Sequence, residues 1–181
     1  MAITNKNQAL DIGFKLQDYT ITKVLSSGGF SFVYLAHDPN KKVVAIKEYM
    51  PTGLVLRNTG ATVQLDDHGD SAIFKQGLKS FFEEGLSLAK IDHKNIVRVL
   101  NFFRSNNTVY MVMKYERGKS LQEYILAHEN PISESFVRRV FAELLNGLRE
   151  VHTHKLLHLD IKPANIYIRL DGSPVLLDFG S

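Results

Sequence analysis

Cysteine is absent from the 181 residues of this chain. Without cysteine there can be no disulfide framework, no thiolate nucleophile and no Cys-ligated metal site. The absence is compatible with a reducing compartment, and we expect a cytoplasmic protein.

Long apolar runs and a leader-like segment are also absent. Residues 109–113 are typical of the longest apolar stretch, which is far shorter than a bilayer requires. Residues 1–10 are polar and lack the apolar part of a secretory signal. The sequence therefore predicts no membrane segment.

The charge is nearly balanced. The chain has 22 Lys and Arg residues and 19 Asp and Glu residues, which gives a net charge of +3. The basic residues occur in scattered pairs such as Lys41-Lys42 and Arg138-Arg139, with acids between them. This pattern favours a solvated surface over a nucleic-acid-binding stripe, and the 44% hydrophobic content is enough for a sizeable core.

The first half of the chain has mainly strand patterns. We expect strands over 19–25, 30–36, 43–49, 97–104 and 108–114, and a small hairpin over 55–65 that turns around Asn58-Thr59-Gly60. The polar loop 66–70 holds three acids and a histidine. A metal site there is possible in principle, but a solvated loop is favoured because no periodic element holds these side chains.

One long helix interrupts the strands, over residues 71–91. Gly77, Phe81, Glu84, Leu88 and Ile91 fall on one face at steps of three and four residues. A glutamate within this inward-facing stripe either meets a cation or lies at the edge of the stripe and reaches water. The periodicity leaves both readings open.

The second half is mainly helical. We expect helices over 120–127 and 133–152, and a terminal hairpin of strands 166–169 and 175–177. The order of elements predicts an α+β chain with a strand-rich first half that holds one long helix, a helical second half, and a break between them near residues 116–119.

Several polar residues that could take part in catalysis or metal binding lie near the C-terminus. His158, Asp160, Lys162 and Asn165 lie between a predicted helix and a strand, and Asp178-Phe179-Gly180 follows the next hairpin. Two carboxylates and an amide at the ends of adjacent strands suit Mg²⁺, which prefers one or two carboxylates plus substrate phosphates.

The first half offers matching features. Lys47 lies in the apolar strand Val44-Ala45-Ile46-Lys47, and Glu84 is a candidate partner for its amine. The small-residue turn around Gly28 and Gly29 would let backbone N–H groups approach phosphate oxygens.

Together, from Tyr19 to Ser181, these motifs resemble the eukaryotic-like (Hanks-type) Ser/Thr protein kinases. A Gly-containing turn, Val-Ala-Ile-Lys, a helix glutamate, His-x-Asp-x-x-x-x-Asn and Asp-Phe-Gly occur in the family's order. The stretches 47–51 and 54–57 resemble bacterial members in particular. The resemblance implies a small lobe over residues 1–115, made of a five-stranded antiparallel sheet with one long helix and a hairpin and loop insertion at about 52–70. The hinge and the first part of a helical lobe would follow over residues 116–181.

The resemblance also implies roles for the motif residues. Lys47, held by Glu84, would neutralise ATP phosphates, while Asn165 and Asp178 would hold Mg²⁺. Asp160 would accept the hydroxyl proton of a protein Ser or Thr, and Lys162 would offset phosphate charge. The residues implied around ATP are Leu25, Gly28, Gly29, Val33, Ala45, Lys47, Met113, Lys114, Glu116 and Tyr167, with Leu121 beside Tyr167 on the floor. Leu88, Val99, His158 and Phe179 would form an apolar spine, which makes His158 structural.

Three departures from the family pattern stand out. Ser26 and Ser31 replace two glycines, so we expect a looser or differently shaped phosphate lid. Leu159 replaces the arginine that normally precedes the catalytic aspartate, which argues against activation through a phosphorylated loop. Lys47 and Glu84 are 84 − 47 = 37 positions apart, a longer separation than the family usually has, because of the insertion.

The chain ends one residue after Asp-Phe-Gly, so we expect a fragment. The alternative is that another copy or a partner covers the apolar stripe of the last long helix, which comprises Val137, Val140, Phe141, Leu144, Leu145, Leu148 and Val151. A non-catalytic kinase-like module and a small-molecule phosphotransferase are the competing readings. The intact charged set counts against the first, and Lys162-Pro163 counts against the second.

Overall fold

A computed structural model describes residues 9–57 and 60–179. The chain divides into two compact units. Among the described residues, the first comprises 9–57, 60–86 and 99–115, and the second comprises 87–98 and 116–179. The chain crosses from the first unit to the second between residues 115 and 116, where the sequence placed a boundary. That the two parts are separate domains stays a prediction.

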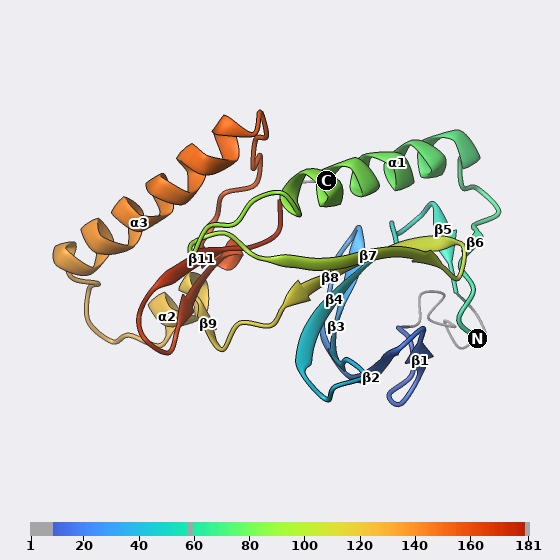
Figure 1. Ribbon diagram of the computed structural model, residues 1–181, viewed down its shortest axis with the longest axis horizontal. Coiled ribbons are helices and arrows are strands. Elements are labelled where there is room, and N and C mark those ends of the chain that lie inside the picture. Colours follow the sequence, from blue (N-terminus) through green and yellow to red (C-terminus); the bar gives the residue numbers. More distant parts are fainter. Residues whose placement is uncertain (1–8, 58–59, 180–181) are drawn as a thin grey trace. The chain divides into compact units, whose positions relative to one another are not determined.

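A six-stranded antiparallel sheet forms the first unit (Figure 1). Its strands run in the order β1-β2-β3-β4-β8-β7. The five strands expected from the sequence are present, and the two-residue strand β1 extends the β2 edge. The strands are β1 (Lys15–Leu16), β2 (Tyr19–Ser27), β3 (Ser31–His37), β4 (Val43–Tyr49), β7 (Val99–Ser105) and β8 (Thr108–Lys114).

Helix α1 (Ser71–Leu88) lies along one face of this sheet (Figure 1). Phe81 packs against both Tyr49 and Phe102, with ring centroids 5.6 and 6.3 Å apart. Glycine permits the close approach, because a Cβ at Gly85 would come within 2.1 Å of the Phe102 ring. The sequence predicted a helix over 71–91; α1 ends at Leu88, three residues earlier.

The opposite face of the sheet carries the main apolar core of the unit. Its buried members come from β1 to β4, β8 and the segment before β1: Leu10, Leu16, Ile21, Tyr34, Ala36, Val44, Ile46, Tyr110 and Val112. Glu48 is buried at 0% exposure, and it is the cross-strand partner of Tyr110. The core therefore encloses a charged group that needs partners.

The insertion supplies one of those partners. It forms a short hairpin of β5 (Val55–Leu56) and β6 (Gln64–Leu65), as expected; the predicted turn residues 58 and 59 lie outside the described residues. Arg57 follows β5 and is 1% exposed. Its guanidinium contacts the Glu48 carboxylate, and its Nε–H donates to the Ala61 carbonyl oxygen at 2.9 Å. A buried ion pair thus fastens the insertion to the sheet.

The second unit combines a three-stranded sheet with helices. The sheet has the order β11-β10-β9, with β9 (Gly118–Ser120), β10 (Ile166–Arg169) and β11 (Pro174–Leu176). The helices are α2 (Leu121–Leu126), α3 (Glu134–Thr153) and the 3₁₀ turn η1 (Pro163–Asn165). Ser120 and Glu123 form a reciprocal capping box on α2, and Ser133 caps α3. Strand β9 was not expected, because three residues carry too little periodicity.

The apolar stripe of α3 is only partly exposed. Val140, Leu144 and Val151 are buried, and Gly147 lets α3 approach Ile96, whose side chain would lie 3.0 Å from an added Cβ. Val137, Phe141 and Leu145 are 41–63% exposed. The expectation that the whole stripe needs an outside cover is therefore wrong for its inner row, which this unit buries itself. Only the outer row remains available to a partner.

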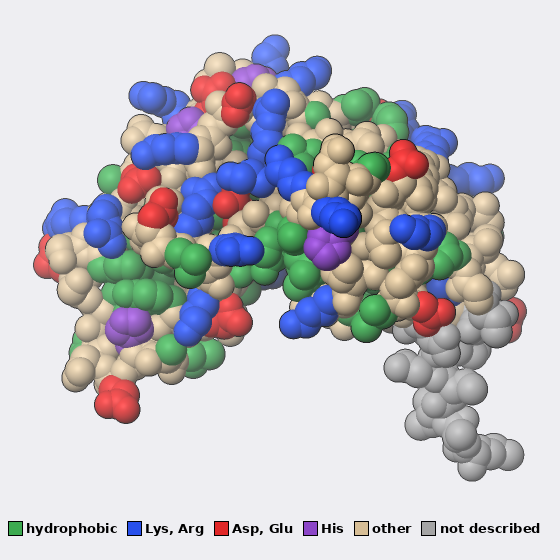
Figure 2. All heavy atoms as spheres, turned by 60° about the horizontal axis from the view of Figure 1, so that its bottom comes forward, with side chains coloured by type: hydrophobic (Ala, Val, Ile, Leu, Met, Phe, Trp, Pro, Cys, Tyr) green, Lys and Arg blue, Asp and Glu red, His purple; other side chains and the backbone are tan. Residues whose placement is uncertain are grey.

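Within residues 9–57 and 60–179, no helix is long and apolar enough to span a bilayer. The same residues contain no group of three or more His, Asp or Glu side chains arranged to hold a metal ion. On the face of the molecule that Figure 2 shows, Lys and Arg side chains are spread out, with acidic side chains between them.

Candidate nucleotide and catalytic site

Strand register brings the expected adenine and phosphate residues of the first unit onto one face of the sheet. Val33 pairs with Lys47, and Ala45 pairs with Met113. Paired residues in adjacent strands point to the same face, and residues two apart in a strand do as well. Val33, Ala45, Lys47 and Met113 therefore share a face.

Lys47 belongs to the face on which α1 packs. Its side chain is 7% exposed, and its Nζ lies 5.8 Å from the centroid of the Phe81 ring. Glu84 is half-buried and follows Phe81 by three residues, which places it on the same side of α1. The amine of Lys47 thus lies beside the helix face that carries Glu84.

The Gly-containing turn has an ordinary backbone. The Gly28 N–H donates to the Ser31 carbonyl oxygen at 2.9 Å, and the Thr52 N–H donates to the Gly29 carbonyl oxygen at 2.7 Å. None of residues 26–31 has a positive φ. The two serines therefore carry no conformational penalty, so the basis for expecting a looser lid is absent. Leu25, at the same edge, is 38% exposed.

The segment after β8 contributes Lys114 to the first unit and Glu116 to the second. Lys114 is exposed, and its backbone pairs with Val44 at the end of the sheet. The Glu116 carboxylate accepts two hydrogen bonds from the Arg169 guanidinium, at 2.8 and 3.0 Å. The Tyr167 hydroxyl donates to the Gly118 carbonyl oxygen at 2.9 Å. Tyr167 and Glu116 are thus fixed by contacts across the β9–β10 pair.

The second unit gathers Asp160, Lys162 and Asn165. The Lys162 amine donates to Oδ2 of Asp160 at 2.7 Å, and the Asn165 side-chain amide donates to the same oxygen at 2.8 Å. The hydrogen bond from Lys162, followed by that from Asn165, lowers the pKa of the Asp160 carboxyl below its ordinary value. Asp160 is therefore an ionised acceptor at neutral pH.

His158 is a buried residue that holds the backbone of this loop by hydrogen bonds. It is 2% exposed, its Nε2–H donates to the Leu177 carbonyl oxygen at 2.8 Å, and its Nδ1 accepts from the Asp160 N–H at 3.3 Å. Its ring packs 4.4 Å from that of Phe179. With both nitrogens used, His158 orients the backbone of Asp160.

Two residues of this region have left-handed backbones. Leu159 has φ +62° and is 80% exposed, and Asp178 has φ +48°. A positive φ is strained for leucine, so the surrounding hydrogen bonds must hold the turn. In this conformation the residue before Asp160 directs its side chain away from the protein interior.

Asn165 and Asp178 lie at matched strand ends. Ile166 pairs with Leu176, and the ladder continues with the Leu177 N–H donating to the Asn165 carbonyl oxygen at 2.8 Å. Asp178 follows immediately. Because the Asn165 side-chain nitrogen is used by Asp160, its Oδ1 is the atom suited to a cation. An amide oxygen and a carboxylate are the ligand types that Mg²⁺ accepts.

Sequence reasoning missed the buried cluster around Glu48. Tyr34 and Tyr110 donate their hydroxyl groups to its two carboxylate oxygens at 2.6 and 2.5 Å, and Arg57 completes the set. The available signal was an acid directly after Lys47 in an otherwise apolar strand, since one of two adjacent strand residues must face the core.

Comparisons with known proteins agree with this arrangement. The model of the Protein kinase domain family matches residues 19–181. Serine/threonine-protein kinase D of Synechocystis sp. is 33% identical over 172 residues, which cover 92% of this chain and 30% of that protein. Serine/threonine-protein kinase PrkC of Bacillus subtilis is 31% identical over 90% of this chain and 22% of its own length.

Solved structures agree as well. The structure titled PpkA-294 apo form has a TM-score of 0.89 at 35% identity and covers 96% of this chain and 62% of its own. The Mycobacterium tuberculosis PknI kinase domain, at 20% identity and a TM-score of 0.73, shares the fold. This chain spans less than a third of the two curated relatives named above. The chain belongs to the protein kinase family and is homologous to the bacterial Hanks-type Ser/Thr kinases, as a partial kinase domain.

Proposed function

We propose that this chain is the ATP-binding and catalytic-loop portion of an ATP- and Mg²⁺-dependent protein serine/threonine kinase. The observation that carries the proposal is the Asp160–Lys162–Asn165 cluster, in which an ionised carboxylate is held by a cation and an amide. Family membership supports the same reading.

Each residue of the cluster has a distinct task in phosphoryl transfer. Lys162 and Asn165 both donate to Oδ2 of Asp160, so we assign Oδ1 to the hydroxyl group of a substrate Ser or Thr. Asp160 orients this hydroxyl and accepts its proton as the new O–P bond forms and the bond between the γ-phosphorus and the bridging oxygen of ATP breaks, with ADP as the leaving group. The Lys162 amine, held beside that carboxylate, offsets the charge of the transferred phosphoryl group.

The phosphates are bound by the remaining charged residues. We assign Lys47, positioned by Glu84, to the non-transferred phosphates of ATP. Asn165 and Asp178 would hold Mg²⁺, which would supply positive charge to offset that of the phosphates. Val33, Ala45 and Met113 present apolar surface suited to the adenine ring, with Leu25, Gly28, Gly29, Lys114, Glu116 and Tyr167 completing the proposed contacts.

A second candidate function is a non-catalytic kinase-like module. The exposed outer row of α3, made of Val137, Phe141 and Leu145, favours it, because such a row suits a second copy or a partner. Size-exclusion chromatography of the wild-type chain and of Leu145→Ser separates the two cases. Concentration-dependent association that the substitution removes would support the module.

The cytoplasmic location stays a prediction.

A phosphotransfer assay tests the catalytic proposal. Radiolabelled ATP, Mg²⁺ and a generic protein substrate are incubated with the chain and with the longest natural protein that contains it. We expect Asp160→Asn to remove transfer in whichever of these is active. Asp171→Asn is the matched control, because Asp171 is an exposed aspartate of the same unit whose carboxylate accepts hydrogen bonds from Ser173. Full activity of Asp160→Asn would overturn the assignment.

A further inference from the structure

The insertion contacts the Gly-containing turn directly, within the first unit. The Thr52 N–H donates to the Gly29 carbonyl oxygen at 2.7 Å, and the Met50 N–H donates to the Phe30 carbonyl oxygen at 2.8 Å. The second contact extends the antiparallel β3–β4 ladder. The first lies beyond that ladder, because β4 ends at Tyr49. The insertion therefore adds a hydrogen bond of its own to the tip of the turn.

Thr52 lies in a tight turn whose backbone suits this contact. The Leu54 N–H donates to the Pro51 carbonyl oxygen at 3.3 Å, and Gly53 has φ +82°. A positive φ at the third of four residues is the pattern of a type II turn, with Thr52 in the second position. The N–H of the second position takes no part in the hydrogen bond that closes such a turn. It can therefore donate to Gly29.

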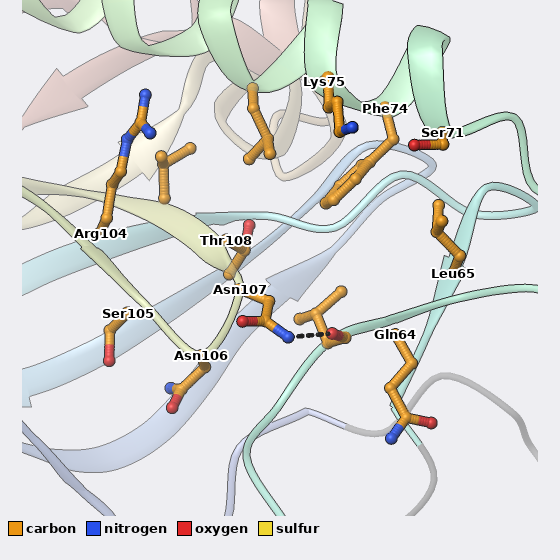
Figure 3. Close-up of a pocket in the computed structure, with 13 residues that line it drawn as sticks. Gln64, Leu65, Ser71, Phe74, Lys75, Arg104, Ser105, Asn106, Asn107 and Thr108 are labelled. Atoms are coloured by element: carbon orange, nitrogen blue, oxygen red, sulfur yellow. Dashed lines mark hydrogen bonds between the residues drawn. The ribbon is translucent and has the colours of Figure 1, made fainter.

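The hairpin that follows this turn is anchored on both strands. Arg57, directly after β5, pairs with the buried Glu48 carboxylate. Just before β6, the Val63 N–H donates to the Asn106 carbonyl oxygen at 2.9 Å, and the Asn107 side-chain amide donates to the Val63 carbonyl oxygen at 3.3 Å (Figure 3). The insertion is therefore a fixed support for the residues at its start.

The same support reaches the strand segment that carries Lys47. Glu48 follows Lys47 directly in β4, and its carboxylate contacts Arg57. The side chains of Lys47 and Glu48 point to opposite faces of the sheet, because neighbours in a strand alternate. The insertion is thus connected to two elements that are assigned to the phosphates, the Gly-containing turn and the segment of β4 around Lys47.

A hydrogen bond that fixes a carbonyl group also fixes the N–H group of the same peptide. The atoms of a trans peptide lie in one plane, and its C=O and N–H bonds point in opposite directions. The Gly29 carbonyl is directed at the Thr52 N–H, so the Phe30 N–H is held on the opposite side. Backbone N–H groups of such turns are donors for phosphate oxygens. Thr52 thus sets the direction of one of these donors.

We propose that Thr52 is a positioning residue for the phosphates of ATP, which acts through its backbone N–H on the Gly29–Phe30 peptide. The inference rests on the proposed function and extends it to a residue that is not among the proposed ATP contacts. A turn that is held in place before ATP arrives loses less conformational freedom on binding, so the phosphates bind more tightly.

Proline at position 52 removes this N–H and is compatible with the turn. Proline lacks a backbone N–H, and the second position of a type II turn is one that it favours. The Thr52 side chain is exposed, so its loss changes little packing. Thr52→Pro is therefore compared with Thr52→Ala, which keeps the N–H and changes only the side chain. Thermal denaturation of both variants establishes that they fold.

The affinities for ATP, ADP and adenosine separate a phosphate effect from a structural one. Isothermal titration calorimetry with Mg²⁺ is carried out on the longest natural protein that contains this chain. We expect Thr52→Pro to bind ATP and ADP about fivefold to tenfold more weakly than Thr52→Ala, and the two variants to bind adenosine equally. Equal affinity of the two variants for ATP would overturn the proposal. An equal loss for adenosine would also overturn it, since it would show a general structural effect.

Hydrogen exchange of the Thr52 amide in the wild type, followed by NMR, tests the direction of the effect. If the held turn is the one that receives the phosphates, ATP with Mg²⁺ should slow this exchange. Faster exchange would mean that the turn leaves Thr52 when ATP binds. Unchanged or faster exchange would contradict the proposal.

Failure of this inference and failure of the proposed function give different results. If the wild type bound ATP no more tightly than adenosine, the phosphate site would be absent, and the proposed function would fall together with the inference. If the wild type preferred ATP and Lys47→Met lost that preference, but Thr52→Pro matched Thr52→Ala, only the positioning role would be wrong.

Discussion

The side-chain amide of Asn165 donates to both the backbone carbonyl oxygen and the Oδ2 carboxylate oxygen of Asp160, at 2.9 and 2.8 Å. This double contact closes the loop between the two residues and fixes the plane of the carboxylate. It also fixes the Asn165 side chain, which is 6% exposed, with its oxygen available to a cation. One amide thereby positions the proposed base and offers a proposed metal ligand.

The pKa of the Asp160 carboxyl should depend on Lys162. Its pKa is lowered by the hydrogen bond from Lys162 and then by that from Asn165. We expect Lys162→Met to raise this pKa, because the first-named donor and its charge are lost. The carboxyl carbon shift, followed by NMR from pH 7 to pH 2, reports the change. Glu123, whose pKa is lowered by its hydrogen bonds with Ser120 in the same unit, is an internal control that should not move with the substitution. An unchanged Asp160 titration would contradict the assigned cause.

The sign of the accompanying stability effect follows from linkage. A carboxyl with a lowered pKa in the folded state stabilises the fold above its unfolded pKa of about 3.9. This contribution is lost as the pH falls through the lower folded value. Lys162→Met should therefore lower stability at neutral pH and flatten the loss of stability on acidification, so that the variant and the wild type converge at the acid end of the curve.

ATP binding provides a prediction for the first unit. We expect Lys47→Met to weaken ATP binding by about tenfold or more, since a buried cation is lost, and Asp178→Ala to abolish its dependence on Mg²⁺. Isothermal titration calorimetry with and without Mg²⁺ measures both. Lys23→Met is a suitable control, because Lys23 is an exposed lysine of β2. Wild-type affinity in both variants would argue against the nucleotide assignment.

Periodicity predicted most elements, because strands and helices that cover a core have apolar residues at fixed spacing. Strand β4 was predicted at its observed bounds, 43–49. Strands β1 and β9 are too short for such a pattern. The site residues were found through motif resemblance rather than periodicity, and the structure brings Asp160, Lys162 and Asn165 together.

The sequence could not predict contacts between segments that are far apart in the chain. Nothing local indicates that Arg57 would reach Glu48, because the pairing depends on how the hairpin folds onto the sheet. The same holds for Gly85, which looks like an unfavourable helix residue until its distance from Phe102 is known. The α3 stripe also needed the structure, since burial of its inner row depends on Ile96.

Gly85 provides a prediction on packing. Alanine is the better helix former by about 1 kcal/mol, but its Cβ would come 2.1 Å from the Phe102 ring. That ring is already packed against Phe81 and Phe82. We expect overpacking to prevail, so that Gly85→Ala lowers the free energy of unfolding by about 1–3 kcal/mol in urea denaturation. Gly29→Ala, with nothing within 4 Å of the added Cβ and no positive φ, should stay close to wild type. Equal stability of the two variants would contradict the packing argument.

Burial raises the pKa of three of the seven tyrosines, Tyr34, Tyr49 and Tyr110, and the two beside Glu48 should resist ionisation most strongly at high pH. Burial raises the pKa of Tyr34 and Tyr110, and the adjacent Glu48 carboxylate raises both further. Their contribution to stability is therefore fully present below the unfolded pKa of about 10 and is lost as the pH rises toward the folded values. Absorbance at the tyrosinate band should show these two titrating only with alkaline unfolding. In Tyr34→Phe the late phase should shrink by one tyrosine, and an unchanged late phase would contradict the assignment.

The Glu48–Arg57 pair provides the sharpest stability prediction. Both side chains are buried, so Arg57→Met leaves a carboxylate inside the sheet with two tyrosine hydroxyls as its remaining side-chain donors among those described. We expect a loss of about 3–5 kcal/mol in the free energy of unfolding, measured by urea denaturation at pH 7. The double variant Glu48→Gln with Arg57→Met should recover part of that loss, because the unpaired charge is removed. The control Arg138→Met breaks an exposed pair with Glu134 and should cost under about 1 kcal/mol. If Arg57→Met cost no more than Arg138→Met, the insertion would not be fastened by this pair.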